Sequence, residues 1–311
     1  MSERFLVTGA YGCIGAWVLR QLVREGVEVV AADASTDDHR VAALLEPAER
    51  ERVRFVQADV SQSGDLAALF EQKPTHVLHL AALQVPACRA DPVRGAHVNV
   101  VGTVALFAAA AAAGLRTPLV YASSAAAFAA ADGGGAAAVD PLGHPDTHYG
   151  VFKLANEETA RVFAADSGVA SIGLRPYVVY GPGRDQGLTS APTQAMRAAV
   201  AGERFEIPYS GRSQLQYGAD VAAAFVAAAR APFTGATVVN VPGVSVSVRE
   251  IVAAIERVVP GAAGLIDVTG PPLPFPSELD SSSFATVVGE LPLTPLDEGV
   301  AATIEHFRRA A

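Results

Sequence analysis

The chain has 311 residues, half of them apolar, and a formal net charge of -9 at pH 7. This length suggests one large domain or two merged lobes. The acidic balance and the lack of a basic run argue against a nucleic-acid partner. The two cysteines, Cys13 and Cys88, lie in apolar contexts without metal-ligand spacing, so no metal site is predicted and a reduced cytoplasmic protein is expected.

The N-terminal residues lead directly into the apolar segment "FLVT", without a signal-peptide pattern. The longest apolar run, "VALFAAAAAAG", has about ten residues, whereas a bilayer requires roughly twenty. We therefore expect a soluble protein with no membrane partner.

Short apolar runs alternate with longer helical segments through the first half of the chain. The runs at 4–9, 27–33, 53–59, 75–82, 117–124 and 170–176 are continuously apolar, which is typical of strands buried on both faces. Helices are predicted between them near 13–25, 39–46, 62–72, 91–113 and 147–167. This alternation predicts an α/β fold with a doubly wound parallel Rossmann sheet.

The segment "LVTGAYGCIG", residues 6–15, follows the first predicted strand and opens the first predicted helix. Gly9, Gly12 and Gly15 allow a tight turn and let a pyrophosphate approach the helix N-terminus, beside Cys13 and Ile14. A glycine-rich match alone is weak evidence. The strand before it and the helix after it supply the context that dinucleotide binding requires.

Carboxylates end the second and third predicted strands. Asp33 would accept hydrogen bonds from both ribose hydroxyls and repel a 2′-phosphate, which favours NAD over NADP. Arg40 is close enough in sequence to leave NADP open. Asp59 and Val60 are candidates for the adenine end of the site, although a solvated strand end explains Asp59 equally well.

"HYGVFKLANE", residues 148–157, places Tyr149 and Lys153 one turn apart on one helix face. This spacing also recurs by chance in soluble helices. A general acid/base needs a pKa nearer neutrality than the usual value near 10 for tyrosine, and the lysine charge is predicted to lower the Tyr149 pKa. Ser124, at the end of the fifth strand, would hold the substrate oxygen; Ser123 is less favoured because adjacent strand residues point to opposite faces. His148 points about 100° away from Tyr149 and is expected to face the protein or an interface.

Seven ordered motifs together resemble one known family: TGxxGxxG, the Asp-ended second strand, "HLAA", "NVVGT", the serine-bearing fifth strand, YxxxK and "LRPYVVYGPG". The family is that of the extended short-chain dehydrogenases/reductases, in the NAD-dependent epimerase/dehydratase branch. The resemblance covers nearly the whole chain and is strongest from 5 to 183. A non-catalytic nucleotide sensor on this fold would lose the serine, tyrosine or lysine, and all three are present.

The resemblance implies an enzyme that uses NAD, with Ser124, Tyr149 and Lys153 as catalytic residues. Tyr149 and Lys153 would also contact the cofactor, with Lys153 bonding the nicotinamide ribose. Asn99 would brace the helix beside the site. Further implied cofactor contacts are Leu80, Ala81, Ala82, Tyr177 and Val178.

Two departures from the family pattern bear on the substrate. Ala125 and Ala126 stand where sugar 4,6-dehydratases carry an Asp-Glu pair, so that dehydration is not expected. Ser213 stands where nucleotide-sugar epimerases carry a diphosphate-binding arginine, with Arg212 one residue earlier. A small sugar, sugar acid or polyol is therefore the expected substrate; the alternative is a UDP-glucose 4-epimerase-like enzyme with tightly bound NAD. The candidate substrate contacts are Gln84, Ser124, Ala125, Tyr149, Arg184, Thr189, Ser190 and Arg212.

After residue 176 the pattern loosens, with helices predicted near 191–201, 219–230, 247–258 and 297–309. We expect an NAD-binding Rossmann domain over 1–176 and a smaller mixed α/β substrate-binding lobe over 177–311, with an interleaved boundary. The alanine- and glycine-rich segment 125–141 is predicted to be a flexible surface loop. The apolar faces of helices 91–113 and 147–167 predict a homodimer, as in relatives where such a pair forms a four-helix interface.

Overall fold

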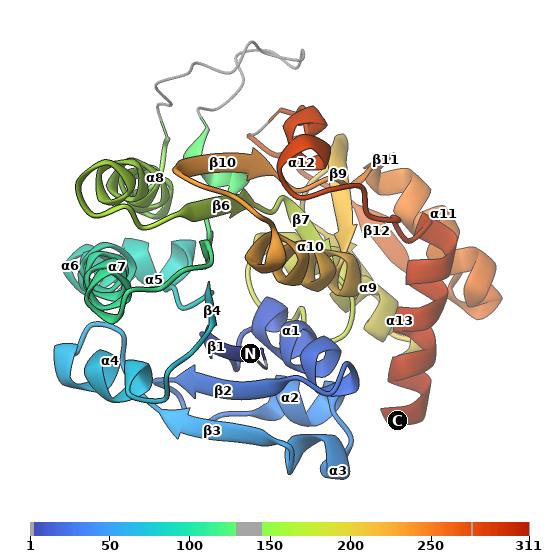
Figure 1. The fold of residues 1–311 in the computed structure, drawn as a ribbon. Helices are drawn as coiled ribbons and strands as arrows, with labels where there is room; N and C mark the ends of the chain where they lie inside the picture. Colours follow the sequence, from blue (N-terminus) through green and yellow to red (C-terminus); the bar gives the residue numbers. More distant parts are fainter. Residues whose placement is uncertain (1–2, 129–144, 275, 311) are drawn as a thin grey trace.

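The structure is a computed structural model that describes residues 3–128, 145–274 and 276–310. Its centre is a seven-stranded sheet in the order β10-β6-β5-β4-β1-β2-β3, and every pairing in it is parallel (Figure 1). The predicted doubly wound Rossmann sheet is thus confirmed. Its strands are β1 (Arg4–Thr8), β2 (Glu28–Asp33), β3 (Val53–Gln57), β4 (His76–His79), β5 (Leu119–Ala122), β6 (Ser171–Arg175) and β10 (Ala236–Asn240).

Helices cover both faces of this sheet (Figure 1). One face carries α1 (Cys13–Arg24), α2 (His39–Leu44), α10 (Gly218–Arg230) and α12 (Ser282–Val287). The other carries α4 (Ser63–Phe70), α7 (Gly102–Ala113) and α8 (His148–Ser167). The strands are continuously apolar because both of their faces are buried against helices.

The predicted helix 91–113 is divided into α6 (Pro92–Ala96), the π-helix η1 (His97–Val101) and α7. Single π-turns inside α-helices are frequent at functional sites. By length and composition, Pro92–Ala113 is the one helical stretch among the described residues that is apolar enough to cross a bilayer. Its Asn99, Thr103 and Leu106 side chains are buried within the fold, so one face of this stretch packs into the protein core, and 33% of the stretch is buried.

The C-terminal half forms a second core. β7 (Val178–Tyr180), β9 (Arg212–Tyr217) and β11 (Val244–Ser247) make a three-stranded sheet, and β8 (Phe205–Ile207) pairs with β12 (Ile266–Val268). α9 (Ala191–Ala201), α11 (Val248–Val258) and α13 (Leu296–Ala310) pack around this core. Strand β10 and helix α10 also follow residue 176, yet they belong to the large sheet, so the two parts are interleaved.

Three short α-helices were not predicted: α3 (Pro47–Arg50), α5 (Val85–Ala90) and α12. The prediction of a flexible surface loop over 125–141 is wrong for its first four residues. Residues 125–128, which include the 3-10 turn η2 (Ala125–Ala127), are buried beside Tyr177 and Leu279. Small side chains are needed there because α8 begins directly on this turn: a Cβ at Gly150 would overlap the Ala126 carbonyl. Residues 129–141 lie outside the described part of the chain.

Candidate active site

The turn between β1 and α1 is built for close approach of a ligand to the backbone. Gly9 has φ +70°, and a Cβ there would overlap the backbone of Ala81. A Cβ at Gly15 would overlap the Gly9 carbonyl. No side chain of the described residues caps the N-terminus of α1, and its first turn holds no acidic residue. The backbone N–H groups at Cys13 and Ile14 therefore fit the pyrophosphate of a dinucleotide.

Asp33 is fixed at the carboxyl end of β2, beside this turn. Its Oδ2 accepts a hydrogen bond from the Tyr11 N–H at 2.9 Å, and its Oδ1 accepts one from the Ser35 N–H at 2.9 Å. Each carboxylate oxygen keeps a further lone pair that a ribose hydroxyl can use. The residues present thus fit the adenosine half of NAD.

Asp59 has a local role in the structure. Its Oδ1 accepts hydrogen bonds from the Ser61 N–H at 2.9 Å and the Ser61 hydroxyl at 2.8 Å, which stabilises the loop after β3. Val60 is buried against Gly102, at the start of α7. Contact of Asp59 and Val60 with adenine stays a prediction.

The segment after β4 runs directly beneath the glycine turn. The Leu80 N–H donates to the Thr8 carbonyl at 2.9 Å, and Ala81 and Ala82 follow it. Asn99 clamps the continuation of this segment to η1: it accepts from the Leu83 N–H at 2.7 Å and donates to the Leu83 carbonyl at 2.8 Å. This geometry supports the bracing role expected of Asn99.

Ser124, Tyr149 and Lys153 come together from the end of β5 and the first two turns of α8. The Ser124 hydroxyl is hydrogen-bonded to the Tyr149 side chain. The Lys153 Nζ lies 5.4 Å from the centroid of the Tyr149 ring and donates to the Ala122 carbonyl at 2.6 Å. Ser123 donates instead to the buried carboxylate of Glu157, so the geometry favours Ser124 as the hydroxyl that faces a substrate.

Burial dominates the pKa values of Tyr149 and Lys153. Burial raises the pKa of Tyr149, and the hydrogen bond with Ser124 opposes this shift. Burial also lowers the pKa of Lys153 to about 8, although Cys88 and Glu157 favour its charged form. Desolvation of the phenolate therefore outweighs the nearby groups that favour it, and a lowering of the Tyr149 pKa by Lys153 stays a prediction.

A buried ion pair that was not predicted supports the end of β5. The Glu157 carboxylate accepts two hydrogen bonds from the Arg175 guanidinium, the Nε one at 2.7 Å, in addition to the one from Ser123. The Arg175 Cζ lies 4.4 Å from the centroid of the Phe128 ring. Glu157 follows Lys153 by one helical turn, and this spacing is the signal that could have identified it.

A second unpredicted network links β1, β4, η1 and α8. His79 is buried between the Thr8 hydroxyl, 2.7 Å from its Nδ1, and the Thr103 hydroxyl, 3.0 Å from its Nε2. Burial lowers the pKa of His79 to about 3, so this ring is neutral. The Asn99 carbonyl accepts from Thr103 at 2.7 Å and from the Asn156 amide at 2.8 Å. The network therefore fixes the π-turn next to the helix that carries Lys153.

The predicted substrate contacts gather in part around the loop after β7. Arg184 donates to the Thr189 hydroxyl at 2.7 Å, and its buried Nε has no hydrogen-bond partner among the described residues. The Arg184 charge favours ionisation of Tyr149, so the guanidinium lies near the catalytic pair. The Gln84 Oε1 lies against Gly187 of the same loop. Ser190 donates its hydroxyl to the Gly187 carbonyl at 2.8 Å and is thereby used within the loop.

Arg212 lies away from this group, and its prediction as a substrate contact is wrong. Its guanidinium is exposed and donates to Glu250 at 3.0 Å and to the Ser245 carbonyl at 2.9 Å. Ser213 is buried, and its hydroxyl has no partner among the described residues. Side chains alternate along β9, so a shift of one residue moves the arginine to the other face of the strand.

Tyr177 and Val178 lie at the start of β7. The Tyr177 hydroxyl donates to the Pro276 carbonyl at 2.7 Å, and its N–H donates to Gln216 at 2.8 Å. Val178 is buried in the second core. Ala125 packs against Tyr177, beneath the end of β5. Contact of Tyr177 and Val178 with the nicotinamide stays a prediction, as does contact of Ala125 with substrate.

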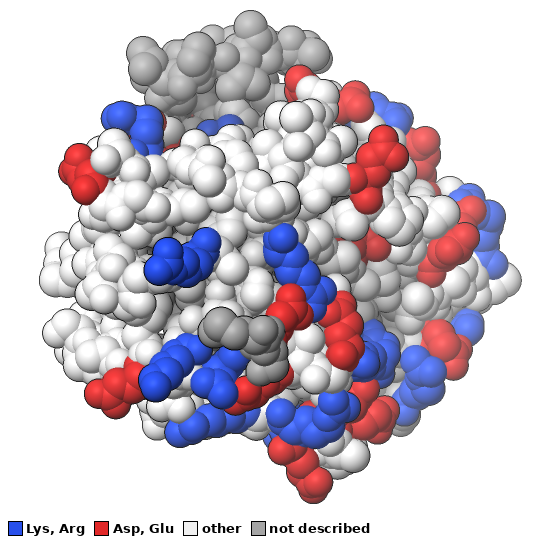
Figure 2. Space-filling model, in the orientation of Figure 1, with Lys and Arg blue, Asp and Glu red and all other residues white. Residues whose placement is uncertain are grey.

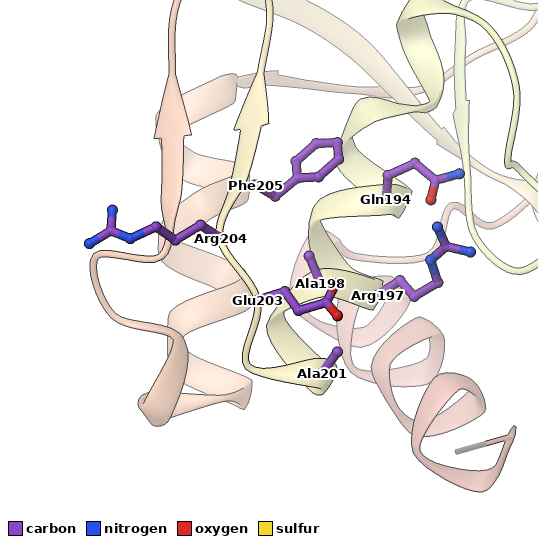
Figure 3. Close-up of a pocket in the computed structure, with 7 residues that line it drawn as sticks. All are labelled: Gln194, Arg197, Ala198, Ala201, Glu203, Arg204 and Phe205. Carbon is purple, nitrogen blue, oxygen red and sulfur yellow. The ribbon is translucent and has the colours of Figure 1, made fainter.

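A surface hollow of about 340 Å³ lies elsewhere, at the end of α9 and the start of β8 (Figure 3). None of its lining residues belongs to the predicted site. They are Gln194, Arg197, Ala198, Ala201, Glu203, Arg204 and Phe205.

A glycine turn at a helix N-terminus and a serine, tyrosine and lysine at the carboxyl end of a parallel sheet define a short-chain dehydrogenase/reductase. Residues 5–241 match the NAD dependent epimerase/dehydratase family, and the chain belongs to this family. It is an NAD-dependent enzyme, as predicted.

Individual relatives agree with this assignment. The chain is 32% identical to a UDP-glucose 4-epimerase of Mycolicibacterium smegmatis over 98% of both chains. A UDP-glucose 4-epimerase of Thermus thermophilus in complex with NAD has TM-score 0.83 and 27% identity, covering 99% of this chain and 100% of that one. L-threonine dehydrogenase of Clostridium difficile has TM-score 0.87 over 99% and 98% of the two chains, but only 21% identity, which shows the shared fold alone.

Proposed function

We propose that the protein oxidises a secondary alcohol of a small sugar, sugar acid or polyol by hydride transfer to NAD. The observation that carries this proposal is the pair of residues at the start of β9. Ser213 stands at the position of the diphosphate-binding arginine of nucleotide-sugar epimerases, and Arg212 is engaged with Glu250 on the other face. A hydroxyl there suits a polyhydroxy substrate better than a diphosphate.

The side chains at the sheet edge have complementary tasks in this reaction. Bound NAD supplies the hydride acceptor. The Ser124 hydroxyl holds the reacting oxygen, and the Tyr149 oxygen, to which it is hydrogen-bonded, receives the alcohol proton. Lys153 would bind the ribose of NAD, and its charge, 5.4 Å from the Tyr149 ring, would favour the phenolate that must form.

Arg184 provides a reason to include sugar acids. Its Nε is buried without a partner, and its charge acts on Tyr149. A carboxylate on the substrate would pair with this guanidinium through charge-assisted hydrogen bonds. Sugar acids should therefore bind more tightly than the corresponding neutral sugars.

A second candidate function is nucleotide-sugar 4-epimerisation with retained NAD. It is favoured by the 32% identity to a UDP-glucose 4-epimerase along 98% of both chains. The same three catalytic residues serve both reactions. The difference is whether the oxidised intermediate leaves or is reduced again on its other face.

The test is a panel of free sugars, sugar acids, polyols and nucleotide sugars, followed by NADH absorbance and by NMR of the products. NADH that accumulates with a free sugar, sugar acid or polyol supports the dehydrogenase. Interconversion of a nucleotide sugar without accumulated NADH, by protein that purifies with bound NAD, would overturn it in favour of the epimerase. The Tyr149→Phe variant is the control for activity from contaminating enzymes.

We also propose that the protein is a homodimer and is cytoplasmic. Five exposed valines lie on the outer helices: Val93 and Val101 on α6 and η1, Val104 on α7, and Val151 and Val162 on α8. The face over these helices, at the left in Figure 2, has few charged side chains. Exposed apolar side chains on a face with few charged residues support an interface between two copies.

A further inference from the structure

Arg40, in α2, lies next to the adenosine end of the nucleotide site. Its Nη1 donates to the Tyr11 carbonyl at 3.2 Å, while the Tyr11 N–H donates to Asp33 at 2.9 Å. Arg40 and Asp33 therefore both bind the backbone of Tyr11, Arg40 at its carbonyl and Asp33 at its N–H. An arginine beside the ribose accommodates the 2′-phosphate of NADP in dinucleotide-binding folds. Arg40 has the position and the charge to do this.

The guanidinium of Arg40 nevertheless pairs with a different carboxylate, that of Asp185. Its Nε donates to both oxygens of Asp185, at 3.0 and 3.2 Å, and its Nη2 donates to Asp185 Oδ1 at 2.7 Å. The Arg40 side chain is only 15% exposed and that of Asp185 31%, so solvent screens this pair less than a surface pair. His39 adds a hydrogen bond of 2.7 Å to the same carboxylate.

Asp185 is itself held firmly by the loop after β7. The Gln194 side chain donates to the Asp185 carbonyl at 2.9 Å, and the Trp17 indole donates to the Pro182 carbonyl at 3.0 Å. Gly183, at φ +82°, packs against the aliphatic part of Arg40. The loop therefore holds the Asp185 carboxylate against Arg40, although the two residues are 145 positions apart in the chain.

We propose that Asp185 is a positioning residue that sets the preference for NAD by holding Arg40 away from the ribose 2′ position. Selectivity then has two parts. Asp33 repels a 2′-phosphate, and Asp185 pairs with the Arg40 guanidinium that would otherwise bind this phosphate. Removal of Asp33 alone leaves Arg40 paired with Asp185. The substitution therefore relieves the repulsion of a 2′-phosphate without creating a site that binds it.

The test measures the dissociation constants of NAD and NADP by calorimetry for the native protein, Asp33→Ala, Asp185→Asn and the double variant. The double variant should bind NADP at least about tenfold more tightly than Asp33→Ala does, because a released guanidinium can form charge-assisted bonds to phosphate. The affinity for NAD should differ much less between the double variant and Asp33→Ala. Adding Arg40→Gln to the double variant should abolish the gain, and Asp185→Glu, which keeps the carboxylate, should not produce it.

Two results would overturn the proposal. Equal weakening of NAD and NADP in Asp185→Asn would make Asp185 a support of the loop only. An unchanged NADP constant in the double variant would mean that freed Arg40 does not reach the phosphate. If the Asp185 variants do not fold, Arg40→Gln in the Asp33→Ala background decides. Unchanged NADP affinity there agrees with a sequestered Arg40, and a tenfold loss means that Arg40 already contacts the phosphate.

Discussion

The Lys153 Nζ lies 5.4 Å from the centroid of the Tyr149 ring, and both side chains project from one face of α8 toward the end of β5. Thr147 defines the start of this helix, since its hydroxyl accepts the Gly150 N–H at 3.0 Å. The cap and the helical repeat together set the separation of the two side chains. The buried end of β5 adds the Ser124 hydroxyl, which completes the group.

Tyr149→Phe should lower turnover by at least about a hundredfold, because it removes the proton acceptor and leaves the ring packing in place. NAD affinity, measured by calorimetry, should remain close to that of the native protein. The matched control is His148→Ala, one residue earlier, where the side chain is exposed and stacks on Phe152. Full activity of Tyr149→Phe on a true substrate would refute the proposed mechanism.

Lys153 should contribute a stability that rises between about pH 8 and pH 10.5. Burial lowers the pKa of Lys153 to about 8, from 10.5 in the unfolded chain, so at this residue the unfolded chain binds more protons between these values. Groups with pKa values raised by burial, such as Cys13, contribute the opposite slope and are common to all variants. In urea unfolding, the change of the free energy of unfolding with pH should therefore be more positive in the native protein and in Lys73→Met, an exposed lysine, than in Lys153→Met. An equal slope in Lys153→Met would show that Lys153 makes no such contribution.

Glu157→Ala should destabilise the fold by about 3 kcal/mol or more, because it leaves the Arg175 charge in a mostly buried place without its partner. Glu158→Ala is the matched control: Glu158 is the next residue and pairs with Arg161 on the exposed face, so its loss should cost less than about 1 kcal/mol. Denaturant unfolding at neutral pH measures both. Equal effects of the two substitutions would contradict the assigned role of the buried pair.

The homodimer prediction can be tested by light scattering at micromolar concentration. The native protein should have the mass of a dimer. Val101→Glu and Val162→Glu should give monomers, because each substitution introduces a charge into an apolar interface. Leu293→Glu changes another exposed apolar residue, on the segment before α13, and should leave the dimer intact. A monomeric native protein would exclude this part of the proposal.

The amino-acid sequence by itself determined the sheet, the glycine turn and the spacing of Tyr149 and Lys153. Each of these features leaves a pattern within a short segment of the chain. Continuous apolar runs require burial on both faces, Gly9 requires a positive φ, and a four-residue interval fixes two side chains on one helix face.

Only the tertiary structure decided which polar groups meet. Arg212 faces Glu250 because the side chains of β9 alternate, and Asp185 reaches Arg40 because the loop after β7 returns to the glycine turn. The raised pKa of Tyr149 likewise depends on burial of this side chain in the folded chain. Partners far apart in the chain, such as Arg40 and Asp185 at 145 positions, are brought together by strand order and loop path, which no local pattern in the sequence records.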